Sequence, residues 1–352
     1  MAEVPQGRAV VRRSTKLLIG ALLAGLLFFV LWNPLSPAKV HRFSGAIMGT
    51  TYHVTLVNAP RNLSLDAVEQ ETMERLQAVD ALMSTYKPDS EVSGFNRTEP
   101  GRWYTVTEDT AQVVDIALKV SELSNGAFDV TVGPLVELWG FGAGGTAQRV
   151  PSADAINAAR ARVGHSAIQL RPVPPGLRKM QPVEIDLSAI AKGYAVDQVA
   201  DHLEARGITN YLVEVGGELR SAGSNPDGHV WEIGIEAPSL LHSGAVQVIG
   251  LGAAAVATSG DYRNYFEQNG QRYSHTIDPR TGTPVQHRLA SVTVVHPSAA
   301  WADALATAIN VLGPEEGFEL AQSMKLAVYL LIQTDAGFEQ RSTSEFARYL
   351  IN

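Results

Sequence analysis

The chain has 352 residues, of which 45% are hydrophobic and 18% charged, a composition typical of a globular protein with a substantial core. After residue 32 it carries 24 basic and 35 acidic residues, a net charge of −11, which is a poor match for the phosphate backbone of nucleic acid. It contains no cysteine, which excludes disulfides, thiolate metal sites, cysteine nucleophiles and a lipid-modified N-terminal cysteine.

Residues 1–32 are predicted to be a signal anchor or a signal peptide. An uncharged apolar run, 17–32, follows a basic segment that holds Arg8, Arg12, Arg13 and Lys16. Positive charge favours the cytoplasmic side, so the body is expected on the periplasmic side of a bacterial inner membrane or free in the periplasm. The length of the run favours an anchor over a cleaved peptide, for which "SPA" (36–38) offers a weak cleavage site. The Arg12-Arg13 pair leaves both the Sec and the twin-arginine export routes open.

A linker is predicted at 33–42, and one domain at 43–352. Its first half is expected to hold a strand at 52–57, a helix capped by Ser64, helices at about 107–124 and 152–163, a loop at 171–176, a strand at 183–188 and a helix from Ser188 to Arg206. The second half is expected to hold strands at 211–215, 230–236, 245–251, 290–295 and 326–333, with a helix at 299–312. Strands and helices do not alternate regularly, which predicts an α+β fold.

The helix at 299–312 carries a candidate metal site. Asp303 and Thr307 are four residues apart, on the face opposite an apolar stripe, and so lie together. A carboxylate and a hydroxyl are hard oxygen donors, which suit Mg²⁺ together with substrate phosphate oxygens. The alternative is an ordinary polar helix face.

Residues 185–197, "IDLSAIAKGYAVD", are expected to run from a strand into a helix. Asp186 would end the strand, Ser188 would cap the helix and Lys192 would lie one turn in. Free backbone groups at such a junction could hold a phosphate or a metal. The alternative is a capped connection with a solvated lysine.

Three further segments each allow a functional and an ordinary interpretation. Asp129 and the glycines of "GFGAGG" (140–145) could border a ligand, or the segment could be a flexible loop. Gly216-Gly217 lies between two strand-like runs and could form a tight hairpin or a bulge. His275 in "SHTIDPRTG" could act as a general base, or its segment could be a surface turn built on Asp278-Pro279.

Taken together, these motifs resemble the ApbE family, the FAD:protein FMN transferases, over about residues 43–350. The matching segments occur in this order: "AIMGTTYHVTL" (46–56), "STYKPDSEVSGFN" (84–96), "GAFDVTVGPLVELWGFG" (126–142), "IDLSAIAKGYAVD", "VEVGGELRSAG" (213–223), "TSGDYRNYF" (258–266), "SHTIDPRTGTPV" and "WADALATAINVLG" (301–313). The resemblance implies a T-fold-like α+β architecture with a flavin-binding cleft. Many bacterial members are lipoproteins anchored through a cysteine, which this chain lacks.

The resemblance also implies site residues. Residues that would contact FAD are Met48, Tyr86, Ala127, Phe128, Asp129, Asp186, Lys192 (a Glu in some relatives) and Ile277 through its backbone. Mg²⁺ would be held by the Ala189 carbonyl, Asp303 and Thr307. For catalysis, Asp303 would act through the metal, and His275 is our candidate for the base.

The implied reaction is Mg²⁺-dependent transfer of FMN from FAD, the substrate, to a Thr or Ser hydroxyl of a target flavoprotein, with release of AMP. The target would be a membrane redox subunit with an acceptor sequence similar to S/T-G-A-S/T. Two alternatives stay open: an FAD pyrophosphatase that yields FMN and AMP, and a non-catalytic periplasmic flavin-binding protein.

Overall fold

The computed structural model describes residues 37–142, 148–236, 244–260 and 264–351. The predicted N-terminal anchor and the last part of the glycine run 140–145 lie outside these residues. No helix within them is long and apolar enough to cross a membrane. The chain from Val40 onward forms one compact unit. The predicted linker 33–42 extends too far, because the first strand already begins at Val40.

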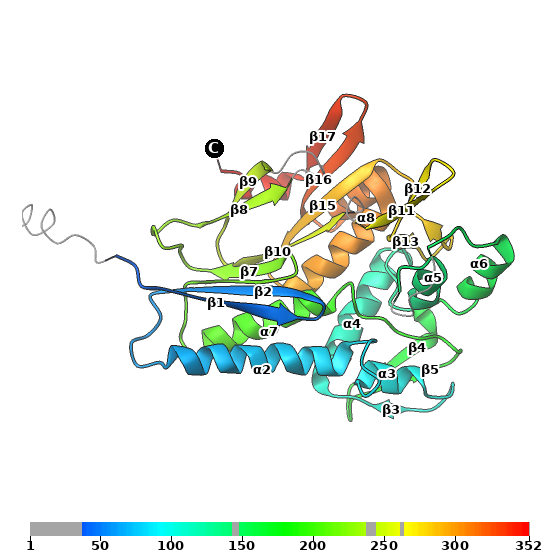
Figure 1. Ribbon diagram of the computed structural model, residues 1–352, viewed down its shortest axis with the longest axis horizontal. Coiled ribbons are helices and arrows are strands. Elements are labelled where there is room, and N and C mark those ends of the chain that lie inside the picture. Colours follow the sequence, from blue (N-terminus) through cyan, green and yellow to red (C-terminus); the bar gives the residue numbers. More distant parts are fainter. Residues whose placement is uncertain (1–36, 143–147, 237–243, 261–263, 352) are drawn as a thin grey trace, which may run out of the picture. The chain divides into compact units, whose positions relative to one another are not determined.

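An eight-stranded sheet, antiparallel throughout, forms the centre of the fold, in the order β1-β2-β6-β7-β10-β15-β16-β17 (Figure 1). Its strands are β1 Val40–Ile47, β2 Thr50–Val57, β6 Tyr211–Val215, β7 Glu218–Ala222, β10 Ala254–Gly260, β15 Leu289–His296, β16 Ala327–Thr334 and β17 Gly337–Ser342. Both β2 and β15 are rich in β-branched residues, which favour strands; β15 buries all but its last residue, whereas β2 buries about half of its residues. The predicted mixed α+β class is confirmed.

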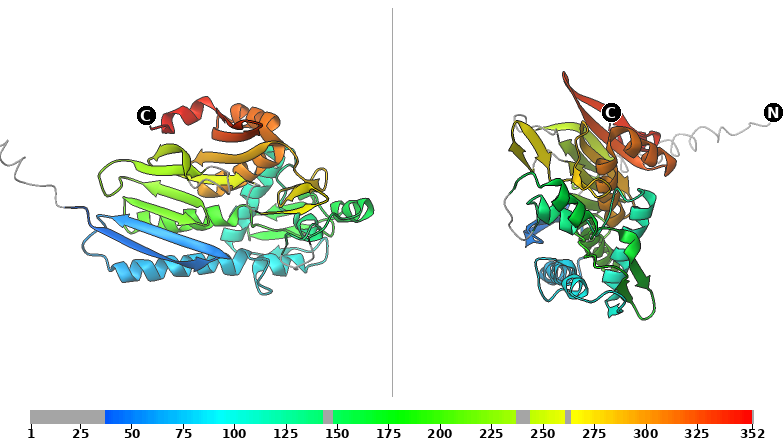
Figure 2. Two further views of the ribbon diagram at one scale, coloured as in Figure 1. Left: turned by 45° about the horizontal axis from the view of Figure 1, so that its top comes forward. Right: turned by 90° about the vertical axis from the view of Figure 1, so that its right-hand side faces the viewer.

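A layer of helices packs against this sheet (Figures 1 and 2). α2 (Leu65–Met83) lies beside α7 (Ala191–Ala205), and α7 lies beside the long helix α8 (Ala299–Ser323). The helix α4 (Glu108–Leu123) packs against α8. Since α7 contacts β6 and β7 while α8 contacts β10 and β15, these two helices cover the middle of the sheet.

Smaller elements surround this framework. The helices α3 (Glu91–Asn96), α5 (Gly133–Leu138) and α6 (Ala153–Arg160) accompany a three-stranded sheet of β3 (Tyr104–Thr105), β5 (Gly176–Lys179) and β4 (Ile168–Arg171). Three two-stranded ribbons pair β8 (Trp231–Glu236) with β9 (Ala245–Leu251), β11 (Tyr265–Gln268) with β12 (Gln271–Ser274), and β13 (Ile277–Asp278) with β14 (Thr283–Pro284). Short 3-10 helices span His165–Ala167 and Ser344–Tyr349.

Two sequence-based boundaries are wrong, and a shared cause explains both. Residues 183–188 form no strand, because the backbone of Ile185 is bonded to the Asn96 side-chain amide and the Asp186 N–H to the Val130 carbonyl. Helix α7 begins at Ala191, not Ser188, because the Ser188 N–H donates to Asp186 Oδ1 (2.8 Å) in a local turn. Distant partners, the Asn96 side chain and the Val130 carbonyl, have taken the hydrogen bonds of a strand, and a local turn stands in place of an earlier helical turn.

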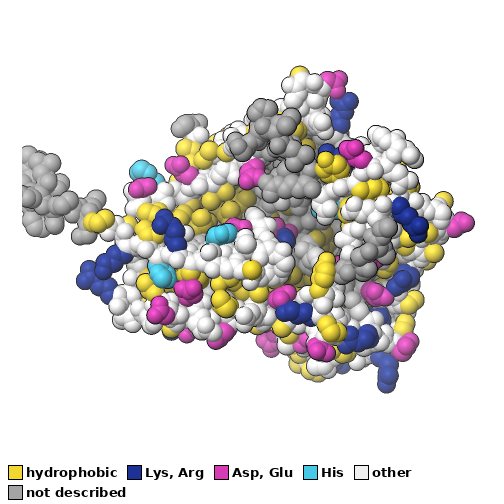
Figure 3. Space-filling view, viewed as in Figure 1, with side chains coloured by type: hydrophobic (Ala, Val, Ile, Leu, Met, Phe, Trp, Pro, Cys, Tyr) yellow, Lys and Arg dark blue, Asp and Glu magenta, His cyan; other side chains and the backbone are white. Residues whose placement is uncertain are grey.

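Other boundaries differ less. Helix α6 ends at Arg160 instead of 163, and the loop 171–176 is the turn between β4 and β5. Helix α8 breaks near the predicted end: Gly313 has a φ of 85° and Pro314 follows it, after which helical structure resumes to Ser323. On the face shown in Figure 3, acidic and basic side chains are interspersed.

Candidate active site

A cavity of about 810 Å³ opens where α7, α8, β7, β10 and the β13–β14 ribbon meet α3 and α5. This volume lies in the range of small-molecule and cofactor pockets. Nearly all the predicted site residues line it: Tyr86, Ala127, Phe128, Asp129, Asp186, Ala189, Lys192, His275, Ile277, Asp303 and Thr307. Segments far apart in the sequence are therefore brought together at one place.

Met48 is the predicted site residue that does not line this cavity. It occupies the tight turn between β1 and β2 with a φ of 51°, next to Gly49 at 71°, and packs partly against the core. The hairpin requires left-handed backbone at both positions. The structure therefore gives Met48 a role in the turn, and its predicted contact with FAD stays a prediction.

One ammonium between two buried carboxylates forms the charged centre of the cavity. Lys192 Nζ lies 2.8 Å from Glu218 Oε2 and 3.8 Å from Asp303 Oδ2. Both acidic side chains are almost fully buried, with residue exposures of 5% for Glu218 and 3% for Asp303. The three residues come from α7, β7 and α8, so this cluster joins the sheet to both helices.

The cluster combines one ammonium with two buried carboxyl groups, and this arrangement shifts the pKa values of all three. Burial raises the pKa of Asp303, against the opposing effects of Lys192 and the Gly193 N–H. Burial and repulsion from Asp303 raise the pKa of Glu218 to about 8. Burial would lower the pKa of Lys192, but attraction to Asp303 and Glu218 outweighs it, and that pKa is raised. The lysine is therefore charged at neutral pH, whereas burial and repulsion favour the protonated form of Glu218.

Helix α8 presents a polar stripe to the cavity. Asp303, Thr307 and Asn310 follow one another at spacings of four and three, and all three line the wall. Thr307 Oγ1 is 3.3 Å from Ser259 Oγ on β10. Asn310 Oδ1 is buried and has no hydrogen-bond partner among the described residues. Asp303 and Thr307 thus both face the cavity instead of forming a solvated helix face, and their metal-binding role stays a prediction.

Helix α7 approaches α8 unusually closely at Gly193. A Cβ at this position would lie 2.3 Å from the Ala299 carbonyl oxygen, so only glycine fits. The Gly193 N–H donates to Asp303 Oδ2 at 3.1 Å. The glycine thus lets the start of α7 bring Ala189 and Lys192 alongside the carboxylate of α8.

Asp129 is held by its neighbour Thr131 and by the distant His165. Its Oδ1 accepts from the Thr131 N–H (2.8 Å), and its Oδ2 accepts from the His165 N–H (2.9 Å) and lies 3.1 Å from His165 Nδ1. Burial would raise the pKa of Asp129, but its hydrogen bonds with His165 and Thr131 lower it. The side-chain bond to Asp129 raises the pKa of His165. This carboxylate shapes the wall beside Phe128.

The segment 274–284 is a hairpin turn and also a wall of the cavity. Asp278 Oδ1 accepts from the Arg280 N–H at 2.9 Å and its carboxylate pairs with the Arg280 guanidinium, which closes the turn between β13 and β14. His275 Nδ1 lies 3.1 Å from the Asn264 carbonyl oxygen. The predicted turn is confirmed, and its first residues reach the cavity.

The donors in this cavity fit a hard divalent cation. Asp303 and Thr307 line the cavity and offer a carboxylate and a hydroxyl, Ala189 lines it with a backbone carbonyl to offer, and the orphaned Asn310 oxygen lies in the same wall. The described residues contain no group of three His, Asp or Glu that could hold a metal alone. Mg²⁺ is commonly bound through one or two carboxylates and completed by substrate phosphates, so this donor set suits it.

Sequence reasoning missed Glu218 and Asn310. Glu218 follows the Gly216-Gly217 turn, which has φ values of 62° and 105° and is the predicted tight hairpin. A two-residue turn pairs Glu218 directly with Val215, which is buried, and this pairing could have revealed that Glu218 lies near the core. Asn310 could have been found by extending the Asp303–Thr307 spacing by one helical turn.

Comparisons with known proteins agree on one family. The sequence model of the ApbE family matches residues 48–330. The chain is 43% identical over 316 residues to a FAD:protein FMN transferase of Vibrio cholerae, covering 89% of this chain and 94% of that protein. It is also 43% identical over 342 residues to one of Haemophilus influenzae, covering 95% and 98%.

Solved structures resemble the fold closely. The flavin transferase ApbE from Vibrio cholerae superimposes with a TM-score of 0.84 at 42% identity, covering 89% of this chain and all of that one. The apo form of Pseudomonas stutzeri flavinyl transferase ApbE gives 0.83 at 41% identity, covering 90% and 98%.

Proposed function

This chain belongs to the ApbE family, and from that premise we propose that it is a FAD:protein FMN transferase. It would move FMN from FAD to a Thr or Ser hydroxyl of a target flavoprotein and release AMP, in a Mg²⁺-dependent reaction. The observation that carries the proposal is the buried cluster of Lys192, Asp303 and Glu218 at the wall of a cofactor-sized cavity. Such a cluster suits the pyrophosphate of a dinucleotide, because it offers one fixed cation and oxygens for a second.

Each residue would have a distinct part. Lys192 would hold a phosphate oxygen of FAD with its ammonium, while Phe128, Tyr86 and the backbone of Ile277 would hold the rings and the ribityl chain. Asp303, Thr307 and the Ala189 carbonyl would hold Mg²⁺, which when bound offsets negative charge on the pyrophosphate. Asp186, which also lines the cavity, would contact FAD.

The transfer balances as one substitution at phosphorus. The acceptor hydroxyl oxygen bonds to the FMN-side phosphorus, the bond to the bridging oxygen breaks, and AMP leaves with that oxygen. The hydroxyl proton must pass to a base. We propose His275 for this role, because it lies in the wall of the cavity and imidazole titrates near neutral pH.

The partner and the location are proposed from the sequence. The acceptor would be a membrane redox subunit with a sequence similar to S/T-G-A-S/T. The catalytic domain would work on the periplasmic side of a bacterial inner membrane, since basic residues precede the apolar run 17–32.

The test is to incubate the full chain with FAD, Mg²⁺ and a purified acceptor domain, and to follow AMP release and the intact mass of the acceptor. A mass gain of one FMN, lost when the acceptor Thr or Ser is replaced by Ala, supports transfer. AMP release with an unmodified acceptor supports a pyrophosphatase instead, and FAD binding without AMP release supports a flavin-binding protein.

A further inference from the structure

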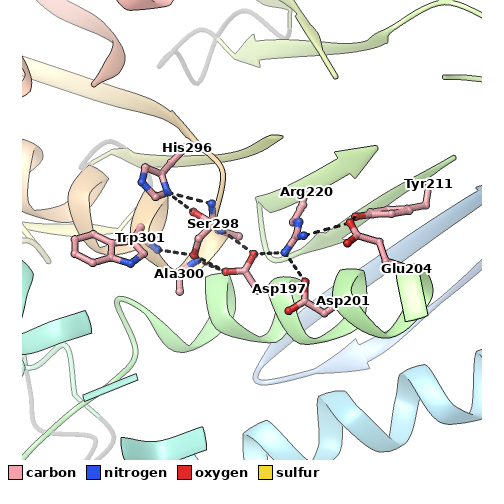
Figure 4. Close-up of polar contacts among 10 residues, drawn as sticks. Asp197, Asp201, Glu204, Tyr211, Arg220, His296, Ser298, Ala300 and Trp301 are labelled. Carbon is pink, nitrogen blue, oxygen red and sulfur yellow. Dashed lines mark hydrogen bonds and ion pairs between the residues drawn. The ribbon is translucent and has the colours of Figure 1, made fainter. Parts of the chain in front are cut away.

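A buried carboxylate outside the cavity joins the two helices that carry the proposed metal site. Asp197 belongs to α7 and is 7% exposed. Figure 4 shows its side chain between the beginning of α8 and the guanidinium of Arg220. It is not among the residues that line the cavity.

Asp197 satisfies the backbone at the N-terminus of α8 from another helix. Its Oδ1 accepts from the Ala299 N–H at 2.9 Å, and its Oδ2 accepts from the Ala300 N–H at 3.0 Å and from the Ser298 hydroxyl at 2.6 Å. Ser298 Oγ accepts in turn from the Trp301 N–H at 3.4 Å. The first free N–H groups of α8 are thus bonded, and a negative charge lies at the positive end of the helix dipole.

The same face of α7 holds α8 at a second place. Gly193 lies four residues before Asp197, one helical turn away, and its N–H donates to Asp303 Oδ2. Two contacts one turn apart fix α8 against both sliding and rotation. Because Asp303 is only about one turn beyond the capped N-terminus, a shift of α8 there moves its carboxylate directly.

Arg220 fixes Asp197 in turn. Its Nη1 lies 3.1 Å from Asp197 Oδ1 and 2.9 Å from Asp201 Oδ1, and its Nη2 lies 3.2 Å from Glu204 Oε1. Arg220 is two residues after Glu218 on β7, so both side chains point to the same face of the strand. In the pair Lys192–Glu218 the helix α7 supplies the cation and β7 the anion, whereas in the pair Asp197–Arg220 the helix supplies the anion and the strand the cation. Together the two pairs set the register of α7 on β7.

We propose that Asp197 is a positioning residue of the active site. By fastening the N-terminus of α8 to α7, it sets where Asp303 and Thr307 stand relative to Ala189 and Lys192, and hence how tightly a divalent cation is bound. The proposal rests on the proposed function in so far as it takes these oxygens to be the metal ligands. It assigns Asp197 no contact with FAD or with the metal.

The test compares Asp197→Asn with Asp201→Asn in the full chain. Asparagine keeps the shape of Asp197 but replaces one acceptor oxygen with an NH₂ group, which cannot accept from the N–H groups of α8. Asp201 is the matched control, because it pairs with the same Arg220, has a side chain 59% exposed and lies outside the α8 cap. The probe is Mn²⁺ titrated into the FAD-loaded protein, followed by loss of the free-ion EPR signal.

We expect Asp197→Asn to weaken Mn²⁺ binding about 10- to 100-fold, as loss of groups that orient metal ligands does. FAD affinity in EDTA should be retained, and Asp201→Asn should match the wild type in both assays. A variant that melts at a lower temperature but binds Mn²⁺ as tightly as the wild type overturns the proposal, because Asp197 is then only a structural cap.

A second variant serves if Asp197→Asn does not fold. Ser298→Ala removes one of the three cap contacts and should also weaken Mn²⁺ binding, but less than Asp197→Asn does. An unchanged Mn²⁺ affinity overturns the proposal.

The proposed function and the positioning role of Asp197 can fail separately. If the wild type binds Mn²⁺ but transfers no FMN, the proposed function fails while the comparison of variants stands. If the wild type binds no Mn²⁺, the positioning role fails and the acceptor assay still decides on transfer.

Discussion

Replacing Lys192 with Met should destabilise the folded protein in a way that depends on pH. The ammonium lies 2.8 Å from Glu218 Oε2 and 3.8 Å from Asp303 Oδ2. At an effective dielectric constant of about 20, these attractions are worth about 6 and about 4 kcal/mol when both carboxyl groups are ionised. The methionine variant avoids the cost of desolvating the ammonium, which is several kcal/mol. The net loss in the free energy of unfolding should therefore be about 3–5 kcal/mol, as for other broken buried pairs.

The cost of protonating a carboxylate gives an independent estimate, of similar size, for the loss in stability of Lys192→Met. Without Lys192, the two carboxylates must together bind one more proton in the folded state than they do in the wild type. Against the ordinary Asp pKa of 3.8, binding it at pH 7 costs about 4 kcal/mol, at about 1.4 kcal/mol per pH unit. The folded mutant holds this extra proton, so its deficit in stability grows as pH rises between about pH 5 and pH 8.

Urea denaturation followed by circular dichroism, in EDTA at pH 6 and pH 8, measures this effect. The deficit should be about 3 kcal/mol larger at the higher pH. Lys119→Met is the control, because Lys119 pairs with Asp115 on an exposed helix surface and should contribute only about 0.3–0.5 kcal/mol. Equal deficits for Lys192→Met at both pH values, or one no larger than the control, would refute the reasoning.

Three further outcomes are expected. Asp303→Ala should keep the fold but lower Mg²⁺-dependent AMP release about 100-fold or more, since a bound metal contributes several kcal/mol; unchanged release in a radiometric or chromatographic assay contradicts the metal assignment. His275→Ala should lower kcat for FMN transfer about 100-fold without changing FAD affinity, and a wild-type kcat excludes it as the base. Tyr86→Ala should weaken FAD binding in a fluorescence titration while the free energy of unfolding stays within about 0.5 kcal/mol, because Tyr86 is 70% exposed; equal FAD affinity removes it from the site.

Local signals in the sequence predicted much of the fold. Ser64 caps α2 as expected, and α4 and α6, which Thr107 and Ser152 cap, begin where the sequence predicts helices. These features depend on a few neighbouring residues, so a pattern within one helical turn is enough to reveal them.

The missed features depend on distant partners. The segment 183–188 has the composition of a strand, but Asn96, far away in the sequence, takes its hydrogen bonds. The strand β10 was not predicted, since a short run with Ala, Ser and Gly acquires its structure from pairing in the sheet. β17, a largely exposed edge strand, lacks an apolar pattern.

In the candidate site, too, the sequence predicted the features that depend on local spacing and missed those that depend on distant partners. Helical spacing alone placed Asp303 beside Thr307, and matching motifs gathered the other lining residues. Spacing could not reveal that Asp303 is buried against Gly193, or that Glu218 shares Lys192 with it, because both contacts join separate elements. The FAD, metal and base roles of these residues stay predictions.

The order of the elements also has a consequence for biosynthesis. The cavity wall draws on residues from Thr85 to Val311, and α8 is seated against β15, whose next partner in the sheet is β16. A nascent chain that has left the ribosome only as far as β10 lacks the carboxylate of Asp303 and the cover of α8. Translation products cut short before that helix should therefore be unable to bind nucleotide productively, whatever part of the sheet they have already formed.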